Sequence, residues 1–206
     1  MISSEMVRAT LPSEDLDILR ASLPPAPMPL AYPYLIVISG LPGSGKSTFS
    51  RLLAQRIPVL LLESDALRKA LFPTPTHSPQ ESARLFRAIH SLIEDCLQKG
   101  IPVLLDATNL QEVHREPLYA IAERQRVPLI LVWVEAPEEV VRQRLERRAR
   151  REDATDLSDA TWEVYQRMRA SAERPRRPYI AVDTSRDITP ALEKIVRLVR
   201  RLSRIR

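Results

Sequence analysis

Five short segments of the chain consist almost wholly of apolar residues. They span residues 34–39, 59–63, 103–106, 128–134 and 179–182. Within each segment the apolar residues are continuous instead of alternating with polar ones, which is typical of parallel strands that are covered on both faces. The pattern therefore predicts five strands of a mostly parallel, buried sheet.

The segments between these strands carry apolar residues at helical spacing. Helices are predicted near residues 46–56, 64–71, 79–99, 111–126, 137–150, 158–173 and 189–205. Strands that alternate with helices in this way favour an α/β fold, in which right-handed crossovers place helices on both faces of the sheet. The predicted fold is a three-layer α/β sandwich.

The first 33 residues follow a different pattern. Ser13 can cap a short acidic helix, EDLDILRASL, that has three leucines on one face. Five prolines between residues 24 and 33 then predict a stiff, extended linker. We expect residues 1–33 to form an appendage, either packed on the domain or mobile, and residues 34–206 to form the main domain.

The composition is that of a globular protein, with 44% hydrophobic and 28% charged residues among 206. The formal net charge is +5, and 27 of the 31 basic residues are arginines, whose planar side chain suits phosphate. This bias favours polyanionic partners, or it reflects genome composition or growth temperature. The single cysteine, Cys96, excludes an internal disulfide framework. With no secretory signal and no apolar run of membrane-spanning length, a cytoplasmic protein without a membrane partner is expected.

Glycine is rare in this chain but concentrated at one place. Of four glycines, Gly40, Gly43 and Gly45 lie within six positions, directly after the first strand. The segment GLPGSGKST fits the phosphate-binding loop G-x-x-x-x-G-K-[ST]. In such a loop, successive amides and a helix N-terminus surround the phosphates, the lysine contacts the β- and γ-phosphates and the hydroxyl binds Mg²⁺. The residues expected to bind the nucleotide are Gly40, Pro42, Gly43, Ser44, Gly45, Lys46, Ser47 and Thr48.

The alternative is a purely structural glycine-rich turn. Among nucleotide-binding proteins, a GTPase would need a guanine-reading N-K-x-D, but the one asparagine, Asn109, is followed by Leu110. A motor ATPase would end a strand with adjacent acids, whereas VLLDAT carries a single acid. The pattern therefore favours a kinase of small size that uses ATP and Mg²⁺, although ATP and GTP are not distinguished.

Two aspartates follow predicted strands, at the edge of a parallel sheet where ligands bind. Asp65 is placed to accept a proton from an attacking hydroxyl, although it can also serve as a helix N-cap, in competition with Ser64. Three residues on, Arg68 can hold an anionic acceptor or neutralise Asp65. Asp106 can hold a magnesium-bound water or the substrate hydroxyl, or orient Arg68.

Thr108 and Asn109 continue the edge that Asp106 begins, so all three are candidate substrate-binding residues. In the alternative interpretation, Asp106 and Asn109 only bond to the local backbone of a turn. Further along, Arg115 is expected to be a solvated helix position, although it could reach phosphate.

An arginine-rich segment, residues 142–151, holds six arginines against one acid. We expect a helical lid over about residues 142–158, in which two arginines face the site and four face solvent. Arg144 and Arg148 share a helix face because they are four residues apart. At the end of the chain, Arg197, Arg200, Arg201 and Arg204 lie opposite an apolar face, as expected of a solvated face or of a nucleic-acid track.

Taken with the loop, the segments LLESDALR, VLLDATNL and VVRQRLERR resemble P-loop kinases of the polynucleotide 5′-hydroxyl kinase and zeta-toxin-like group, over about residues 35–168. The resemblance implies a nucleotide-kinase-like P-loop NTPase fold. It also implies that Asp65 is the general base, that Arg68 contacts acceptor phosphate, and that Arg144 and Arg148 lie near the nucleotide and on its phosphates. Catalysis would then depend on Lys46, Asp65 and Arg148, with Ser47 and Asp106 at the metal.

The sequence therefore predicts an ATP-dependent kinase that transfers the γ-phosphoryl group to a hydroxyl, most simply the 5′-OH of a polynucleotide. A small metabolite such as a nucleoside, sugar, nucleotide-sugar or antibiotic is the alternative acceptor. An ATP-gated module that binds nucleic acid or protein is a hypothesis from another class. The oligomeric state is left open.

Overall fold

The computed structural model describes residues 13–150 and 160–202. At its centre is a five-stranded sheet in the order β2-β3-β1-β4-β5, in which every neighbouring pair is parallel. The strands are β1 (Leu35–Ser39), β2 (Leu60–Glu63), β3 (Val103–Asp106), β4 (Leu129–Glu135) and β5 (Tyr179–Asp183). All five predicted strands are confirmed, and so is the predicted α/β P-loop NTPase fold.

Helices connect and cover the strands. Their bounds are α1 (Ser13–Ala21), α2 (Lys46–Ala54), α3 (Ser64–Leu71), α4 (Pro79–Gln98), α5 (Glu112–Gln125), α6 (Glu138–Ala149), α7 (Trp162–Ala170) and α8 (Thr189–Leu202). The helix predicted near residues 158–173 is α7, and the first two residues of that prediction lie outside the described ones. No helix among the described residues is long and apolar enough to span a membrane.

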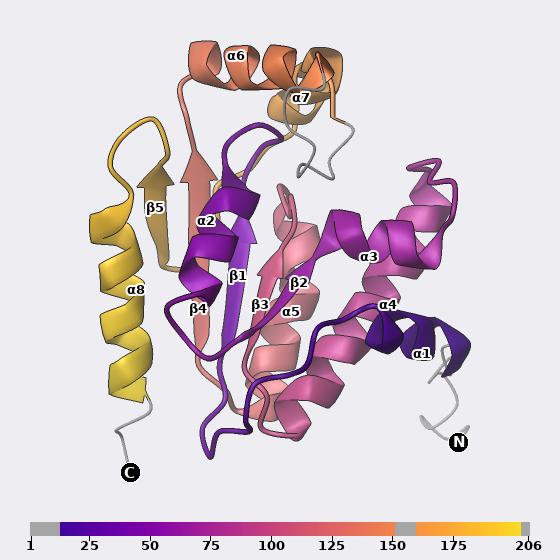
Figure 1. Ribbon diagram of the computed structural model, residues 1–206, viewed down its shortest axis with the longest axis vertical. Coiled ribbons are helices and arrows are strands. Elements are labelled where there is room, and N and C mark those ends of the chain that lie inside the picture. The colour runs from indigo at the N-terminus through magenta and orange to yellow at the C-terminus, as the bar shows by residue number, and fades with distance from the viewer. Residues whose placement is uncertain (1–12, 151–159, 203–206) are drawn as a thin grey trace, which may run out of the picture.

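The sheet separates two apolar cores, which is why its strands are apolar on both faces. On one face, α2 and α8 pack Phe49, Leu53 and Ile195 against the strands (Figure 1). On the other face, α1, α3, α4 and α5 supply the larger core, which includes Leu85 and Ile89. A third, small cluster joins α6 and α7 through Val141, Leu145 and Tyr165. In Figure 1 these two helices lie over the carboxyl ends of the strands.

The N-terminal helix α1 packs on the main domain. Leu19 is fully buried in the larger core, and the carboxylate of Asp15, also fully buried, accepts hydrogen bonds of 2.8 and 2.5 Å from Arg84 of α4. Further along, the amide of Leu30 donates to the carbonyl of Gly100 at 2.8 Å. These contacts hold α1 against α4, and they hold the linker against the turn that precedes β3.

Candidate functional site

The glycine-rich loop lies between β1 and α2, and its backbone takes conformations that favour glycine. Gly45 has φ +89° and forms the N-cap of α2. Gly43 has φ +74°, and a Cβ atom there would come within 2.9 Å of Val141 on α6. Since a helix N-terminus presents free amides and the positive end of its dipole, this turn is suited to bind an anion.

Lys46, the first residue of α2, reaches back over the loop. Its Nζ donates to the carbonyl oxygen of Leu41 at 3.0 Å. The next residue, Ser47, donates its hydroxyl to the carboxylate of Asp106 at the end of β3. The loop, Lys46, Ser47 and Asp106 therefore face one another at the carboxyl edge of the sheet, where a parallel α/β sheet binds ligands.

The carboxyl of Asp106 is the most perturbed acid of the site. Only 4% of the residue is exposed, and burial raises its pKa from 3.8 to about 6. Lys46 and the Ser47 hydrogen bond act in the opposite direction, while the negative charges of Glu63 and Asp65 add to the rise. Glu63 ends β2 directly beside Asp106 in the sheet register. The charges of Lys46, Glu63 and Asp65 thus all act on Asp106, while the Glu63 carboxylate itself is paired with Arg51 of α2 at 2.9 Å.

Asp65 is the second residue of α3 and is half-buried. The N-cap of α3 is Glu63, without a side-chain capping bond, so the interpretation of Asp65 or Ser64 as an N-cap is wrong. Because β2 ends at Glu63 and α3 begins at Ser64 with no intervening turn, Ser64 and Asp65 lie inside the helix instead of capping it. Asp65 lies near enough to Asp106 for its negative charge to raise the pKa of that carboxyl.

Arg68 lies on the same helix but contacts a different set of residues. Its guanidinium forms a buried ion pair with Glu81 of α4 and donates to the Ser82 hydroxyl at 3.2 Å. Glu81 also accepts bonds from the amide and hydroxyl of Thr76. Desolvation would raise the pKa of Glu81, but these bonds outweigh it and lower that pKa to about 2. Arg68 therefore anchors the α3–α4 connection, instead of neutralising Asp65.

The segment after β3 is held by a buried arginine that the sequence did not single out for this role. Arg115 of α5 is fully buried, and it donates to the carboxylate of Glu112 at 2.7 Å, to the Asn109 carbonyl at 2.5 Å and to the Glu173 carbonyl at 3.0 Å. The expectation of a solvated helix position was wrong, because its partner Glu173 lies 58 residues away in sequence. The Arg115 bonds fix the backbone at Asn109, which has φ +40°.

Asn109 itself is almost fully buried, and its Nδ2 has no hydrogen-bond partner in the part of the chain that the structure describes. Thr108 is half-buried, and its carbonyl accepts from the amide of Gly40 at 3.1 Å. Both candidates therefore lie beside the glycine-rich loop.

The arginine-rich helix α6 contacts the loop directly. Arg144 donates to the hydroxyl and the carbonyl of Thr184 at 2.8 and 2.9 Å, and to the Gly43 carbonyl at 3.4 Å. The Thr184 hydroxyl in turn donates to the Ser44 carbonyl at 2.6 Å. Thr184 follows β5 and was missed by the sequence analysis, although a polar residue after a buried strand is a signal. Burial lowers the pKa of Arg144.

The other arginines of α6 differ in burial. Arg148, one turn after Arg144, is half-buried, whereas Arg142, Arg147 and Arg150 are exposed. Arg142 pairs with Glu146 at 2.9 Å and lies over the ring of Trp162 at 5.7 Å. Residues 151–158 of the predicted lid lie outside the described ones.

Two oxygen-bearing side chains beside the loop, those of Ser47 and Asp106, are candidate ligands for Mg²⁺. Among the described residues no group of three or more His, Cys, Asp or Glu side chains could hold a metal ion. Mg²⁺ keeps several waters and is often held by one or two protein oxygens plus substrate phosphates. The Ser47 hydroxyl and the Asp106 carboxylate fit that requirement.

Comparisons with known proteins bear on the family and the fold of the chain. A family model described as AAA domain matches residues 35–203. The L-seryl-tRNA(Sec) kinase of Methanococcus maripaludis is 31% identical over 108 residues, which cover 50% of this chain and 41% of that protein. The chain therefore spans less than half the length of this curated relative.

Two solved structures illustrate the shared fold. Kti12 of Chaetomium thermophilum in complex with ADP-AlF3 is 21% identical with a TM-score of 0.65, covering 82% of this chain and 98% of that one. The APS kinase of Mycobacterium tuberculosis in complex with AMPPNP and APS is 20% identical with a TM-score of 0.60, covering 85% and 99%. At these identities the likeness establishes the fold.

Proposed function

Because the chain belongs to the AAA domain family, a P-loop kinase-like family, we propose that it is an ATP-dependent kinase that phosphorylates a hydroxyl group. The observation that carries this proposal is the cluster of Lys46, Ser47 and Asp106 beside the glycine-rich loop, with Asp65 close enough to perturb Asp106. A phosphate-binding turn with carboxylates facing it is what phosphoryl transfer to a hydroxyl requires.

In this proposal each group of site residues has a separate role in phosphoryl transfer. The loop amides and Lys46 bind the triphosphate, and Asp65 accepts the proton of the attacking hydroxyl. Arg144 and Arg148, on the helix that rests on the loop, neutralise charge that spreads over the transferred group. Ser47 and Asp106 would hold Mg²⁺, which offsets the negative charge of the β- and γ-phosphates when bound. Most of the rate enhancement then comes from positioning and electrostatics.

The first candidate acceptor is the 5′-OH of a polynucleotide. The motifs after β2 and β3 support it through their resemblance to polynucleotide kinases, and the arginine-rich composition suits a polyanion. The curated relative is named for a tRNA-linked acceptor, which also favours a substrate carried on nucleic acid.

A small, neutral metabolite is the second candidate, and the position of Arg68 favours it. In the polynucleotide hypothesis this arginine contacts acceptor phosphate, whereas here its guanidinium is buried against Glu81. Breaking a buried ion pair is costly, so Arg68 would have to gain at least as much from the acceptor.

An acceptor screen with γ-labelled ATP tests the proposal. Oligonucleotides of DNA and RNA with a free 5′-OH are compared with nucleosides and sugars, and the Lys46→Ala variant is the control. Label transferred to one acceptor class by the natural chain alone is the expected result, and a steep loss of transfer with added salt identifies a polynucleotide. Label that appears only as free phosphate, with every acceptor, contradicts a kinase.

A further inference from the structure

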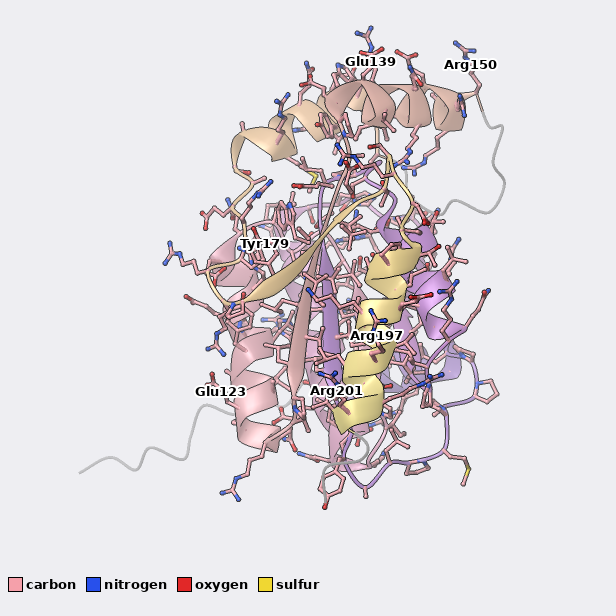
Figure 2. All side chains as sticks on the ribbon, turned by 90° about the vertical axis from the view of Figure 1, so that its left-hand side faces the viewer. Glu123, Glu139, Arg150, Tyr179, Arg197 and Arg201 are labelled. Atoms are coloured by element: carbon pink, nitrogen blue, oxygen red, sulfur yellow. The ribbon has the colours of Figure 1, made fainter. Side chains whose placement is uncertain are left out.

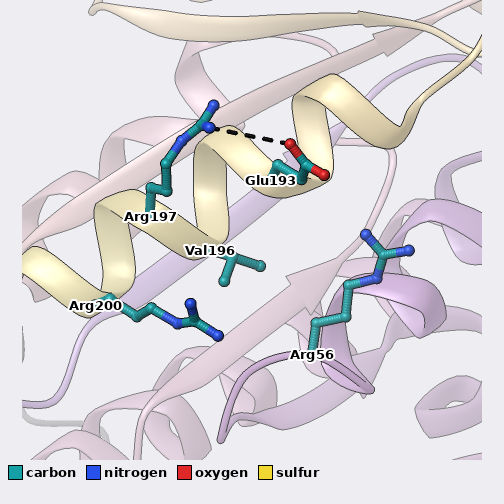
Figure 3. A pocket seen from close by; sticks show the side chains of 5 residues that line it. All are labelled: Arg56, Glu193, Val196, Arg197 and Arg200. Atoms are coloured by element: carbon teal, nitrogen blue, oxygen red, sulfur yellow. Dashed lines mark ion pairs between the residues drawn. The ribbon is translucent and has the colours of Figure 1, made fainter.

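A groove of about 470 Å³ lies between the end of α2 and the middle of α8 (Figure 3). Its lining consists of Arg56, Glu193, Val196, Arg197 and Arg200. In Figure 3, Arg56 reaches in from the α2 side, and Arg200 from the α8 side. The two helices pack against one face of the sheet through their apolar residues, so their polar sides form the walls of this groove.

The groove carries an excess of positive charge. Arg197 is paired with Glu193 at 3.9 Å, a separation at the outer limit of an ion pair. Within residues 13–150 and 160–202, neither Arg56 nor Arg200 has a carboxylate at ion-pair distance. The cations that Arg56, just after α2, and Arg200 of α8 bring to one groove repel each other unless an anion lies between them. The groove is therefore more favourable when it holds negative charge.

The positive surface continues along α8. Figure 2 faces the outer side of this helix, where Arg197 and Arg201 lie. Most apolar residues of α8, such as Leu192, Ile195 and Val199, are buried in the core, and Leu198 is the one large apolar side chain of this helix, among the described residues, that is exposed. A helix that docks on a membrane needs a continuous exposed apolar face, and one exposed leucine among arginines does not form such a face.

The groove is separate from the glycine-rich loop. Arg56 lies two residues beyond the end of α2, and the helix from Lys46 to Ala54 alone corresponds to about 12 Å at about 1.5 Å per residue. An anion in the groove is therefore beyond contact with a nucleotide held at the N-terminus of α2.

We propose that this groove, with Arg56 and Arg200 as its principal contacts, binds the phosphate backbone of a polynucleotide at a site separate from the phosphate-binding loop. Arginine favours this ligand because its planar fork binds a phosphate through two hydrogen bonds. A row of cations along a groove and a helix matches a ligand whose charges repeat along a chain, as those of nucleic acid do. The groove binds backbone and not bases, so it recognises polynucleotides without regard to sequence.

The test is equilibrium binding of a fluorescently labelled, covalently closed circle of single-stranded DNA, without ATP. A circle has no 5′ end, so it cannot bind as an acceptor, and this measurement does not depend on phosphoryl transfer. The double variant Arg56→Glu with Arg200→Glu is compared with Arg87→Glu with Arg126→Glu. The control replaces two exposed arginines of α4 and the end of α5, and it changes the net charge by the same amount.

The groove variant is expected to bind at least about tenfold more weakly. It should also reduce the slope of log affinity against log salt by about 1.4, because it loses two phosphate contacts and each contact on a single strand contributes about 0.7. The control variant should retain most of the affinity. Glu193→Gln removes the acid from the groove and should tighten binding, a gain that a folding defect cannot produce.

Three results would overturn the proposal. One is equal weakening in the groove and control variants, which would mean that net charge alone attracts DNA. Another is failure of Glu193→Gln to tighten binding. The third is complete displacement of the circle by polyglutamate at an equal concentration of charges, which would indicate an acidic protein segment as the partner.

Discussion

Replacing Asp106 by Asn should stabilise the protein while it abolishes catalysis. Ionising this buried carboxyl is unfavourable in the folded chain, where its pKa is about 6 against 3.8 for the unfolded chain. The difference of about two units, at about 1.36 kcal/mol each, corresponds to about 3 kcal/mol at pH 7.5. Asn has the same shape, stays neutral, and can still accept the Ser47 hydrogen bond through its carbonyl oxygen.

The sign and the pH window follow from proton linkage. Because the folded state holds the proton more tightly than the unfolded chain, the free energy of unfolding falls as the pH rises from about 4 to about 6. The advantage of Asp106→Asn is therefore about 3 kcal/mol at pH 7.5 and about 1 kcal/mol at pH 4.5. For a chain of this size, the larger value corresponds to a melting temperature about 6–12 °C higher.

Urea denaturation at both pH values, without nucleotide or Mg²⁺, measures the effect. Asp183→Asn is a matched control, since it makes the same change at the end of β5. Hydrogen bonds from the Ser185 hydroxyl and amide hold the pKa of Asp183 below its ordinary value, so its replacement should destabilise the protein at pH 7.5. An Asp106→Asn variant that is no more stable than the natural chain at pH 7.5, or that gains equally at pH 4.5, would refute the reasoning.

Three further predictions concern the loop, the base and the buried arginine. Lys46→Ala should abolish label transfer from ATP, because the triphosphate loses its point charge, and full transfer by this variant would remove the lysine from the mechanism. Asp65→Asn should lower turnover by about 10²–10⁴-fold in single-turnover assays but leave ATP binding intact; unchanged turnover would exclude a general base there. Arg115→Gln should lower the free energy of unfolding in urea by about 3–5 kcal/mol, since it leaves Glu112 buried without its partner, and an unchanged value would contradict that.

The sequence predicted local structure well, because strand and helix patterns depend on neighbouring residues. The continuous apolar segments became the five strands, and the glycine-rich loop lies between β1 and α2 as expected. The position of Asp106 near the loop could also be predicted. It lies close to Lys46 and Ser47 because parallel strands end at one edge of a sheet.

The pairing of charged side chains could not be predicted, because partners lie far apart in sequence. Arg68 has the spacing of a site residue, but Glu81 lies 13 residues on and binds it instead. The sequence neighbours of Arg115 on α5 are largely polar, which is typical of an exposed helix position. In the folded chain the segment at Glu173 packs against Arg115, which is fully buried. The order of the strands in the sheet likewise depends on contacts between segments that no local pattern specifies.

The docking of α1 has a practical consequence for anyone who shortens this chain. A protein that starts at residue 34, where the main domain is predicted to begin, would lose the helix that covers part of α4, together with the buried Leu19. Arg84 would lose its buried partner Asp15, and an apolar strip of α4 would meet water. Shortened proteins of this kind should therefore self-associate, so a recombinant form intended for crystals or assays should keep α1 in place.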